Sequence, residues 1–256
     1  MTMEALAYKQ FLKLEDTHWW FIGRRRVLFS LLDRHLPPGG DRVILDVGCG
    51  YGGMLVPLAR RGRVMGLEID FDSARFCRRR GFEDICLGSG YALPFRTGVM
   101  DVVTLFDTIE HIDDDLRVVR ECTRILRPGG LLVVSVPAYQ FLYADNDRIA
   151  HHRRRYTLTG LKRTVRAAGL RVRWGTYYNV LLFPVILPVV LLLKLKQALR
   201  GPLPEGRGST NLSYRAPRPA AFLLEKIFSS ERLFLPRVPA PFGHSIALLA
   251  EKPPEG

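Results

Sequence analysis

The most constraining feature of the chain is a short apolar strand that ends in a glycine-rich loop, followed by a second strand that ends in an acid. Residues 43–53 read VILDVGCGYGG and residues 64–70 read VMGLEID. Glycine interrupts a strand and permits close approach to the backbone, so nucleoside or phosphate groups can lie against such a loop. Glu68, about 20 residues further on, suits a ribose diol because a carboxylate accepts two hydroxyl hydrogen bonds. The pattern therefore predicts a nucleoside site.

Strand and helix patterns alternate after residue 42. The predicted strands are 43–47, 63–68, 84–87, 130–136, 171–177 and 245–250, and the predicted helices are 52–61, 71–80, 113–126 and 157–169. Alternation at this spacing predicts an α/β fold, a Rossmann-like doubly wound sheet that is mostly parallel with helices on both faces. Ligands of such sheets bind outside the carboxyl ends of the strands.

The glycine spacing separates this loop from other nucleotide loops. Asp46-x-Gly48-x-Gly50-x-Gly52 is not the G-x-G-x-x-G of dinucleotide folds, and no Gly-Lys-Ser/Thr follows it. Residues 44–53 resemble the first motif of class I S-adenosylmethionine-dependent methyltransferases. Three further segments resemble later motifs of that superfamily, in the correct order: 93–95 (LPF), 101–111 (DVVTLFDTIEH) and 126–137 (LRPGGLLVVSVP).

The resemblance implies a cofactor and its site. It assigns Gly48 and Gly50 to the methionine and ribose side of S-adenosylmethionine, Glu68 to the ribose, and Ile69 to packing against adenine. Many relatives carry an aspartate where this chain has Ser89, whose hydroxyl accepts a hydrogen bond without charge. The full cofactor set is Asp46, Gly48, Cys49, Gly50, Glu68, Ile69, Ser89, Gly90, Tyr91 and Phe106. Residues 245–250 resemble the antiparallel last strand of the superfamily.

An acid, a second acid and an imidazole follow the fourth motif strand at Asp107, Glu110 and His111. These side chains would converge on one face if the segment were helical. The run resembles the E-x-x-E-H metal site of small-RNA 2′-O-methyltransferases and of ubiquinone-pathway O-methyltransferases. We nevertheless expect no metal, with these three residues as the ligands if one binds. The predicted catalytic residues are His111, as a general base, with Asp107 and His152.

Residues 151–156 (HHRRRY) are expected to cover the acceptor side. Arginine binds phosphate and carboxylate groups through paired donors, although a salt-bridge cluster would have the same composition. The predicted substrate-binding residues are Glu110, Tyr139, Arg154, Arg155, Tyr156 and Trp20. The segments H-W-W-F, V-P-A-Y and H-x-R-R-Y-T together resemble a bacterial methyltransferase subgroup linked to cell-envelope or polyprenyl-linked substrates.

Composition shifts along the chain suggest four segments. They are an N-terminal helical lid (1–40), the methyltransferase core (41–178), an apolar and basic insertion (179–243), and the last strand with the tail (244–256). The insertion opens with an apolar run, 180–193, which is shorter than the about 20 residues that span a bilayer. This run suits a buried, re-entrant or interfacial segment.

The charge balance favours an anionic partner. Lys+Arg 38 against Asp+Glu 25 gives a net charge of +13, which fits nucleic acid, anionic lipid, a phosphorylated substrate or simply a solvated basic surface. Four cysteines without C-x-x-C spacing fit a reducing cytosol, and the N-terminus lacks a signal-peptide core. We expect a cytoplasmic enzyme, peripheral on the inner membrane face, with the oligomeric state left open.

The predicted activity is O-methylation of a small or lipid-linked acceptor, phosphorylated or polyprenyl in type. The tetrapeptide after the fourth strand, residues 106–109 (FDTI), is not the D/N-P-P-Y type of enzymes that methylate DNA amino groups. Two alternatives stay open: an RNA-directed methyltransferase, and a non-catalytic module that binds S-adenosylmethionine or a nucleotide. The acceptor molecule and the acceptor atom are not determined by the sequence.

Overall fold

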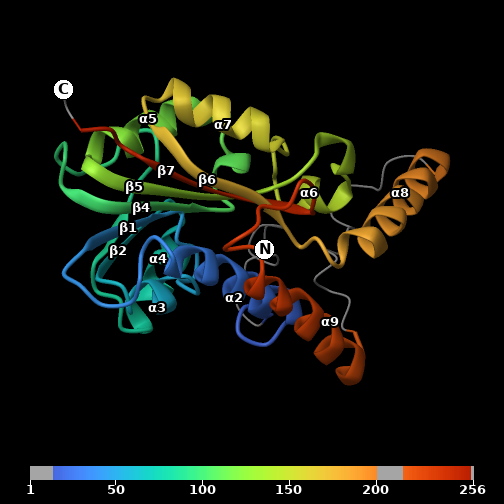
Figure 1. The fold of residues 1–256 in the computed structure, drawn as a ribbon. Helices are drawn as coiled ribbons and strands as arrows, with labels where there is room; N and C mark the ends of the chain where they lie inside the picture. The colour runs from blue at the N-terminus through green and yellow to red at the C-terminus, as the bar shows by residue number, and fades with distance from the viewer. Residues whose placement is uncertain (1–13, 201–215, 255–256) are drawn as a thin grey trace.

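A seven-stranded sheet forms the centre of the molecule. The structure is a computed structural model that describes residues 14–200 and 216–254 (Figure 1). The strands are β1 (Val43–Val47), β2 (Arg63–Glu68), β3 (Ile85–Leu87), β4 (Met100–Phe106), β5 (Leu126–Pro137), β6 (Arg171–Tyr178) and β7 (Ser245–Glu251). Their order is β3-β2-β1-β4-β5-β7-β6. β7 pairs antiparallel with both β5 and β6, while β1 to β5 pair in parallel. The predicted Rossmann-like sheet with an antiparallel last strand is confirmed.

Helices cover both faces of the sheet. They are α2 (Trp19–Asp33), α3 (Leu55–Leu58), α4 (Phe71–Arg79), α5 (Asp115–Ile125), α6 (Asp145–Ile149), α7 (Leu158–Ala167), α8 (Phe183–Arg200) and α9 (Arg218–Ser230), with the 3₁₀ turns η1 (Ile109–His111), η2 (Gln140–Leu142) and η4 (Glu231–Leu233). The α5 and α7 helices pack on one face, and α2, α3 and α9 pack on the other (Figure 1). Successive strand residues alternate between these layers: Leu45 faces α5 and Ile44 faces α2.

Two predicted boundaries differ from the observed ones. The predicted helix 52–61 contains only α3, because Gly52 has a φ of +84° that a helix does not accept. The predicted strand 130–136 begins earlier, at Leu126, because Leu126 already pairs with Met100 of β4 before a register shift. Residues 1–13 of the predicted N-terminal helical lid and residues 201–215 of the insertion lie outside the described residues.

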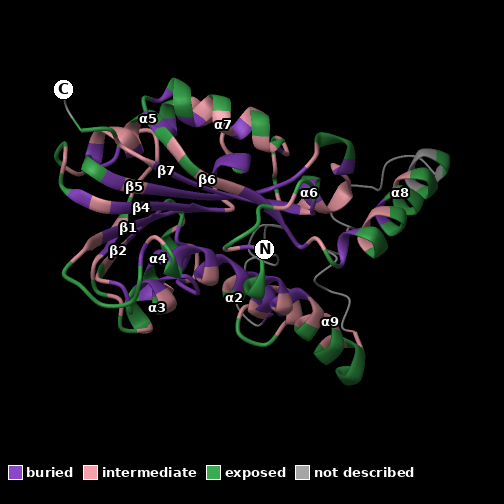
Figure 2. Cartoon of the chain, viewed as in Figure 1, coloured by how far each residue is buried: buried purple, intermediate pink, exposed green. Residues whose placement is uncertain are grey.

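The insertion divides into two helices that differ in packing. The α9 helix packs against α2 at Gly23, where a Cβ atom would lie 2.5 Å from the ring of Phe228. The α8 helix projects away from the sheet, and its outer part is exposed (Figures 1 and 2). None of the described helices is both long enough and apolar enough to cross a membrane.

Candidate active site

The glycine loop and Glu68 meet at the carboxyl edge of the sheet. The β1 and β2 strands run in parallel, so the loop after β1 lies beside the end of β2. The Glu68 carboxylate accepts hydrogen bonds from the backbone N–H groups of Gly50 (2.8 Å), Ile69 (2.9 Å) and Asp70 (2.9 Å). Oε1 accepts two of these bonds and Oε2 accepts one, so Oε2 keeps a lone pair for a hydroxyl.

Two glycines of this loop are required by different constraints. A Cβ atom at Gly48 would lie 2.6 Å from the side chain of Thr108, so only glycine allows the loop to approach the end of β4. Gly50 has a φ of +55°, and no atom lies within 4 Å of the position that its Cβ would take. Open space therefore faces Gly50, and the loop fits a ligand that lies against the backbone.

The predicted adenine side is apolar and open. Ile69 directly follows the acid, and 73% of its side chain is exposed, which suits a planar ring against it. Ser89 and Tyr91 lie after β3, where the Ser89 hydroxyl accepts from the Tyr91 N–H (3.3 Å). The Tyr91 hydroxyl in turn accepts from the N–H of Asp114 (3.1 Å), which ties this turn to the start of α5. Gly90 lies in the same turn, where a Cβ atom would lie 3.3 Å from the Val118 side chain.

Three residues of the predicted cofactor set are buried inside the core. Asp46 accepts a hydrogen bond from the Thr104 hydroxyl (2.6 Å), and burial raises the pKa of Asp46 to about 7. Phe106 packs beside Phe29 of α2, and Cys49 belongs to the small cluster beneath the loop. These contacts pack the glycine loop and the strand ends against the core.

Asp107 is paired with the N-terminal helix. Its carboxylate oxygen lies 2.8 Å from Nη2 of Arg24, whose side chain is 7% exposed. The other carboxylate oxygen accepts from the Ser135 hydroxyl (2.8 Å). Trp20 lies over the Arg24 guanidinium at 5.6 Å, which brings the predicted Trp20 to this edge of the sheet.

The structure groups Glu110 and His111 with His152, whereas Asp107 is paired with Arg24. Asp107 has a φ of +53°, and only a single 3₁₀ turn, η1, follows it. This conformation directs Asp107 to Arg24, and His152 takes its place beside Glu110 and His111. One ligand atom from each of these three residues lies within 4.8 Å of the others.

Glu110 is fully buried without a hydrogen bond to either carboxylate oxygen from the described residues. Burial and the neighbouring Asp107 raise the pKa of Glu110 well above its usual value. Desolvation by the surrounding protein and the nearby His152 lower the pKa of His111 to about 4. The cluster therefore combines a carboxyl whose pKa is raised with an imidazole whose pKa is lowered. These donors would also suit a divalent cation.

His152 is held by a buried carboxylate that sequence reasoning missed. Its Nδ1 lies 2.8 Å from Oδ1 of Asp147, and its ring lies edge-on to that of His111, at 4.7 Å. Arg155 donates to both oxygens of Asp147, from Nε (2.7 Å) and Nη2 (2.9 Å). The hydrogen bonds from His152 and Arg155 outweigh burial and lower the pKa of Asp147 to about 2. An acid five residues before His152 and eight residues before Arg155 was the only sequence signal for this arrangement.

The predicted arginine pair is divided between two environments. The guanidinium of Arg155 is buried against Asp147, so its donors point into the protein and not at an acceptor. Arg154 is more exposed and donates to the carbonyl of Asp113 (2.6 Å). The Tyr156 hydroxyl donates to Asp115 (2.7 Å) and is likewise engaged within the chain.

Tyr139 begins a series of aromatic rings that leads from this side of the site to α8. Its ring stacks on Tyr177 at 5.2 Å and contacts Phe183, the first residue of α8, at 5.9 Å. Phe183 in turn lies 6.1 Å from Phe242, and Phe141 lies 5.3 Å from Tyr139. Phe141 and Phe242 are exposed, so the series ends at the surface.

Comparison with known proteins identifies the same class of domain. Residues 45–134 match the family model described as a methyltransferase domain. A probable S-adenosylmethionine-dependent methyltransferase of Mycolicibacterium smegmatis is 39% identical over 48% of this chain and 48% of its own length. A ubiquinone biosynthesis O-methyltransferase of Chromobacterium violaceum is 32% identical over 41% of this chain and 48% of its own length. The chain thus spans about half the length of these curated relatives.

A solved structure shows the same fold over nearly the whole chain. A possible histamine N-methyltransferase from Thermotoga maritima superposes with a TM-score of 0.57, covering 98% of this chain and all of the other. The two sequences are 20% identical, so this similarity concerns the fold alone.

Proposed function

Because the chain belongs to the class I S-adenosylmethionine-dependent methyltransferase superfamily, we propose that it transfers a methyl group to a hydroxyl of an amphiphilic, lipid-linked acceptor at a membrane surface. S-adenosylmethionine supplies an activated methyl group when bound. The protein therefore has to bind the cofactor, align the acceptor with its methyl group, and exclude water. Gly48, Gly50 and Glu68 would hold the cofactor, with Ile69 against its adenine.

The observation that carries the choice of a hydroxyl acceptor is the pair formed by His152 and Asp147. A hydroxyl becomes a better nucleophile when a base removes its proton, and imidazole is the usual base near neutral pH. Asp147 orients the His152 ring through Nδ1, which leaves Nε2 to receive a proton from the acceptor. Arg155 holds Asp147 in place from the other side and acts as a positioning residue. The name of the ubiquinone O-methyltransferase relative is in keeping with oxygen as the acceptor atom.

The aromatic series from Tyr139 to Phe242 supports an acceptor with an apolar portion. An acceptor whose hydroxyl lies near His152 could extend its apolar portion along Tyr139 and Phe183 toward α8. Lys194 of α8 donates to the Phe141 carbonyl (2.6 Å), which fixes the inner part of this helix to η2. This hydrogen bond joins α8 to the segment that directly follows Tyr139.

The exposed surface of α8 supports docking on lipid. Leu191, Leu192 and Leu193 are all exposed, and so are Leu195 and Leu199. Successive residues of a helix point about 100° apart, so three consecutive leucines cover most of its circumference. A second protein would cover one face of the helix, whereas lipid can surround all of it. Lys196 lies among these leucines and is exposed, so it could add about 1 kcal/mol against anionic headgroups.

Transfer of labelled methyl groups tests the proposal. The protein and radioactive S-adenosylmethionine are incubated in one reaction with a total bacterial lipid extract and in another with bacterial RNA. The radioactivity transferred to the lipid and to the RNA is then counted. We expect label in lipid, at an alkali-stable ether. Label in RNA alone would refute the proposal in favour of the RNA-directed alternative. No label in either, together with no calorimetric binding of S-adenosylhomocysteine, would refute the methyltransferase activity itself.

A further inference from the structure

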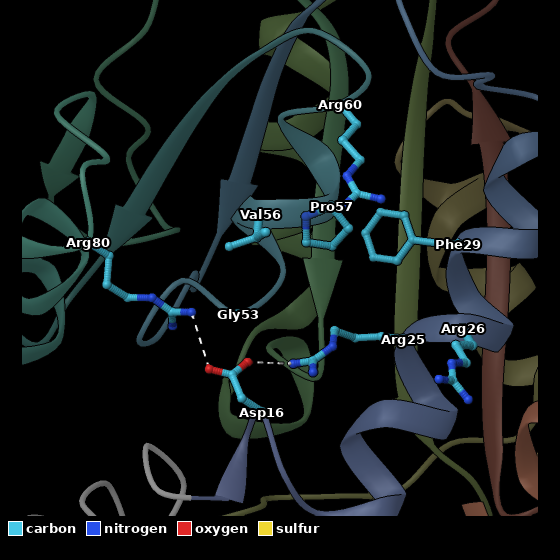
Figure 3. Close-up of a pocket in the computed structure, with 9 residues that line it drawn as sticks. All are labelled: Asp16, Arg25, Arg26, Phe29, Gly53, Val56, Pro57, Arg60 and Arg80. Atoms are coloured by element: carbon cyan, nitrogen blue, oxygen red, sulfur yellow. Dashed lines mark ion pairs between the residues drawn. The ribbon is translucent and has the colours of Figure 1, made fainter. Parts of the chain in front are cut away.

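A cavity separate from the His152 cluster lies between α2, the glycine loop and α3 (Figure 3). Its volume is about 330 Å³, within the range of small-molecule sites. Arginines from three different segments line it: Arg25 and Arg26 from α2, Arg60 after α3, and Arg80 after α4. The proposed methyl transfer uses none of these side chains.

The lining carries an excess of positive charge. Four arginines face one lining acid, Asp16, which gives +3. Two further acids, which do not line the cavity, pair with lining arginines and reduce the excess positive charge to +1. Glu15 is 3.2 Å from Arg80, and Glu225 is paired with Arg26.

Two of the four guanidinium groups are available to a ligand. Arg80 donates to the Tyr51 carbonyl (2.9 Å) and to Glu15, so its donors are largely engaged. Arg60 has no hydrogen-bond or carboxylate partner among residues 14–200 and 216–254, and it lies beside Phe29 in Figure 3. Among the described residues, Arg25 forms an ion pair with Asp16, at 3.5 Å, and the Asp16 side chain is 64% exposed. An incoming anion can therefore replace Asp16 beside Arg25 without breaking a buried ion pair.

The rest of the wall is apolar. Phe29, Val56 and Pro57 lie between Arg25 and Arg60. Guanidinium groups bind phosphate oxygens through paired donors, whereas an apolar wall contributes nothing to binding a bare inorganic ion. We propose that this cavity binds a phosphate or diphosphate group attached to an apolar chain, with the anion between Arg25 and Arg60 and the chain against Phe29 and Val56.

Titration calorimetry without cofactor tests this site separately from methyl transfer. The probes are geranyl diphosphate and inorganic pyrophosphate, each titrated into the intact protein. We expect measurable binding of both, with geranyl diphosphate at least tenfold tighter. Equal affinity for the two probes would overturn the role of the apolar wall, and no binding of either would overturn the site.

Substitutions of single cavity residues test whether geranyl diphosphate binds in this cavity. Arg60→Gln and Arg25→Gln should each weaken geranyl diphosphate binding about tenfold, the loss expected for one charge-assisted contact. Arg166→Gln is the matched control, because Arg166 is exposed on α7 across the sheet. Asp16→Asn should strengthen binding severalfold, since it removes the competing carboxylate, and a variant that is merely unstable would not bind more tightly.

Three results would overturn the proposal. An equal loss in Arg166→Gln would show that the anion responds to net charge alone. Unchanged affinity in Asp16→Asn would show that Asp16 does not compete for the site. A parallel loss of S-adenosylhomocysteine binding in Arg60→Gln would place the cavity within the cofactor site. Failure of the methyl-transfer assay alone would leave these binding results standing.

Discussion

The buried Arg24 of α2 and the partly exposed Asp107, which directly follows β4, form an ion pair with 2.8 Å between Nη2 and Oδ2. The pair ties the N-terminal helix to the strand end that carries η1, and thereby to Glu110 and His111. Asp107 adopts a left-handed φ of +53° in doing so, a conformation that aspartate tolerates better than most residues.

Arg24→Met should cost about 3 kcal/mol of unfolding free energy, because it leaves Asp107 without its buried partner. The double variant Arg24→Met with Asp107→Asn should recover more than half of that loss, since the uncompensated charge is then gone. Urea unfolding of the single and double variants measures both effects. Strictly additive losses would contradict a direct interaction between the two side chains.

Glu68→Gln should weaken S-adenosylhomocysteine binding at least tenfold in calorimetry. An amide oxygen replaces one carboxylate oxygen, and its NH₂ group faces backbone N–H donors that need an acceptor. Asp72→Asn, an exposed acid-to-amide change on the neighbouring α4, is the control and should bind normally. Equal binding by both variants would remove Glu68 from the cofactor site.

His152→Asn should lower methyl transfer to the lipid extract by about 10²- to 10⁴-fold, the usual contribution of a general base. Binding of S-adenosylhomocysteine should stay within twofold of the parent. His151→Asn is the matched control, because His151 is exposed and the hydrogen bond to Asp147 comes from His152.

The same variants distinguish a base from a metal ligand. If the cluster of Glu110, His111 and His152 binds a divalent cation, dialysis against EDTA should abolish transfer and Mg²⁺, Mn²⁺ or Zn²⁺ should restore it. A base requires no such restoration. Activity that survives EDTA but is lost in His152→Asn supports the base.

Asp46 should give the protein a measurable pH dependence of stability. Burial raises its pKa from 3.8 to about 7, so between these values the native state keeps a proton that the unfolded chain has lost. The free energy of unfolding should therefore fall as pH rises from about 4 to about 7, by up to about 4 kcal/mol. Asp46→Asn should flatten this part of the profile. A parallel profile in the variant would assign the effect to other buried acids, such as Glu110.

Leu192→Glu, alone and with Leu191→Glu, should reduce flotation with vesicles that contain phosphatidylglycerol. Both leucines are exposed on α8, and a charged side chain opposes insertion among acyl chains. Val99→Glu, an equal change at an exposed position before β4, should leave flotation unchanged. Full recovery of the parent protein in the unbound fraction at low salt would contradict docking on lipid.

The sequence alone determined the sheet, the cofactor loop and its acid. These features depend on local patterns. Consecutive apolar residues indicate a buried strand, and glycines at fixed spacing indicate a loop whose backbone lies close to a ligand. The order of four motifs along the chain then determined the superfamily.

Only the tertiary structure decided which side chains meet at the acceptor side. Arg24 with Asp107, and His152 with Glu110, join residues from segments far apart in the sequence, and no local period records such a contact. The fold pairs the Asp107 carboxylate with Arg24 and groups His152 with Glu110 and His111, and the sequence pattern did not indicate either contact. Burial likewise gave Arg155 a partner in Asp147, whereas its composition suggested a free phosphate ligand. Side chains with the same charge act differently according to the partner that the fold provides, and the sequence lists the charges but not the partners.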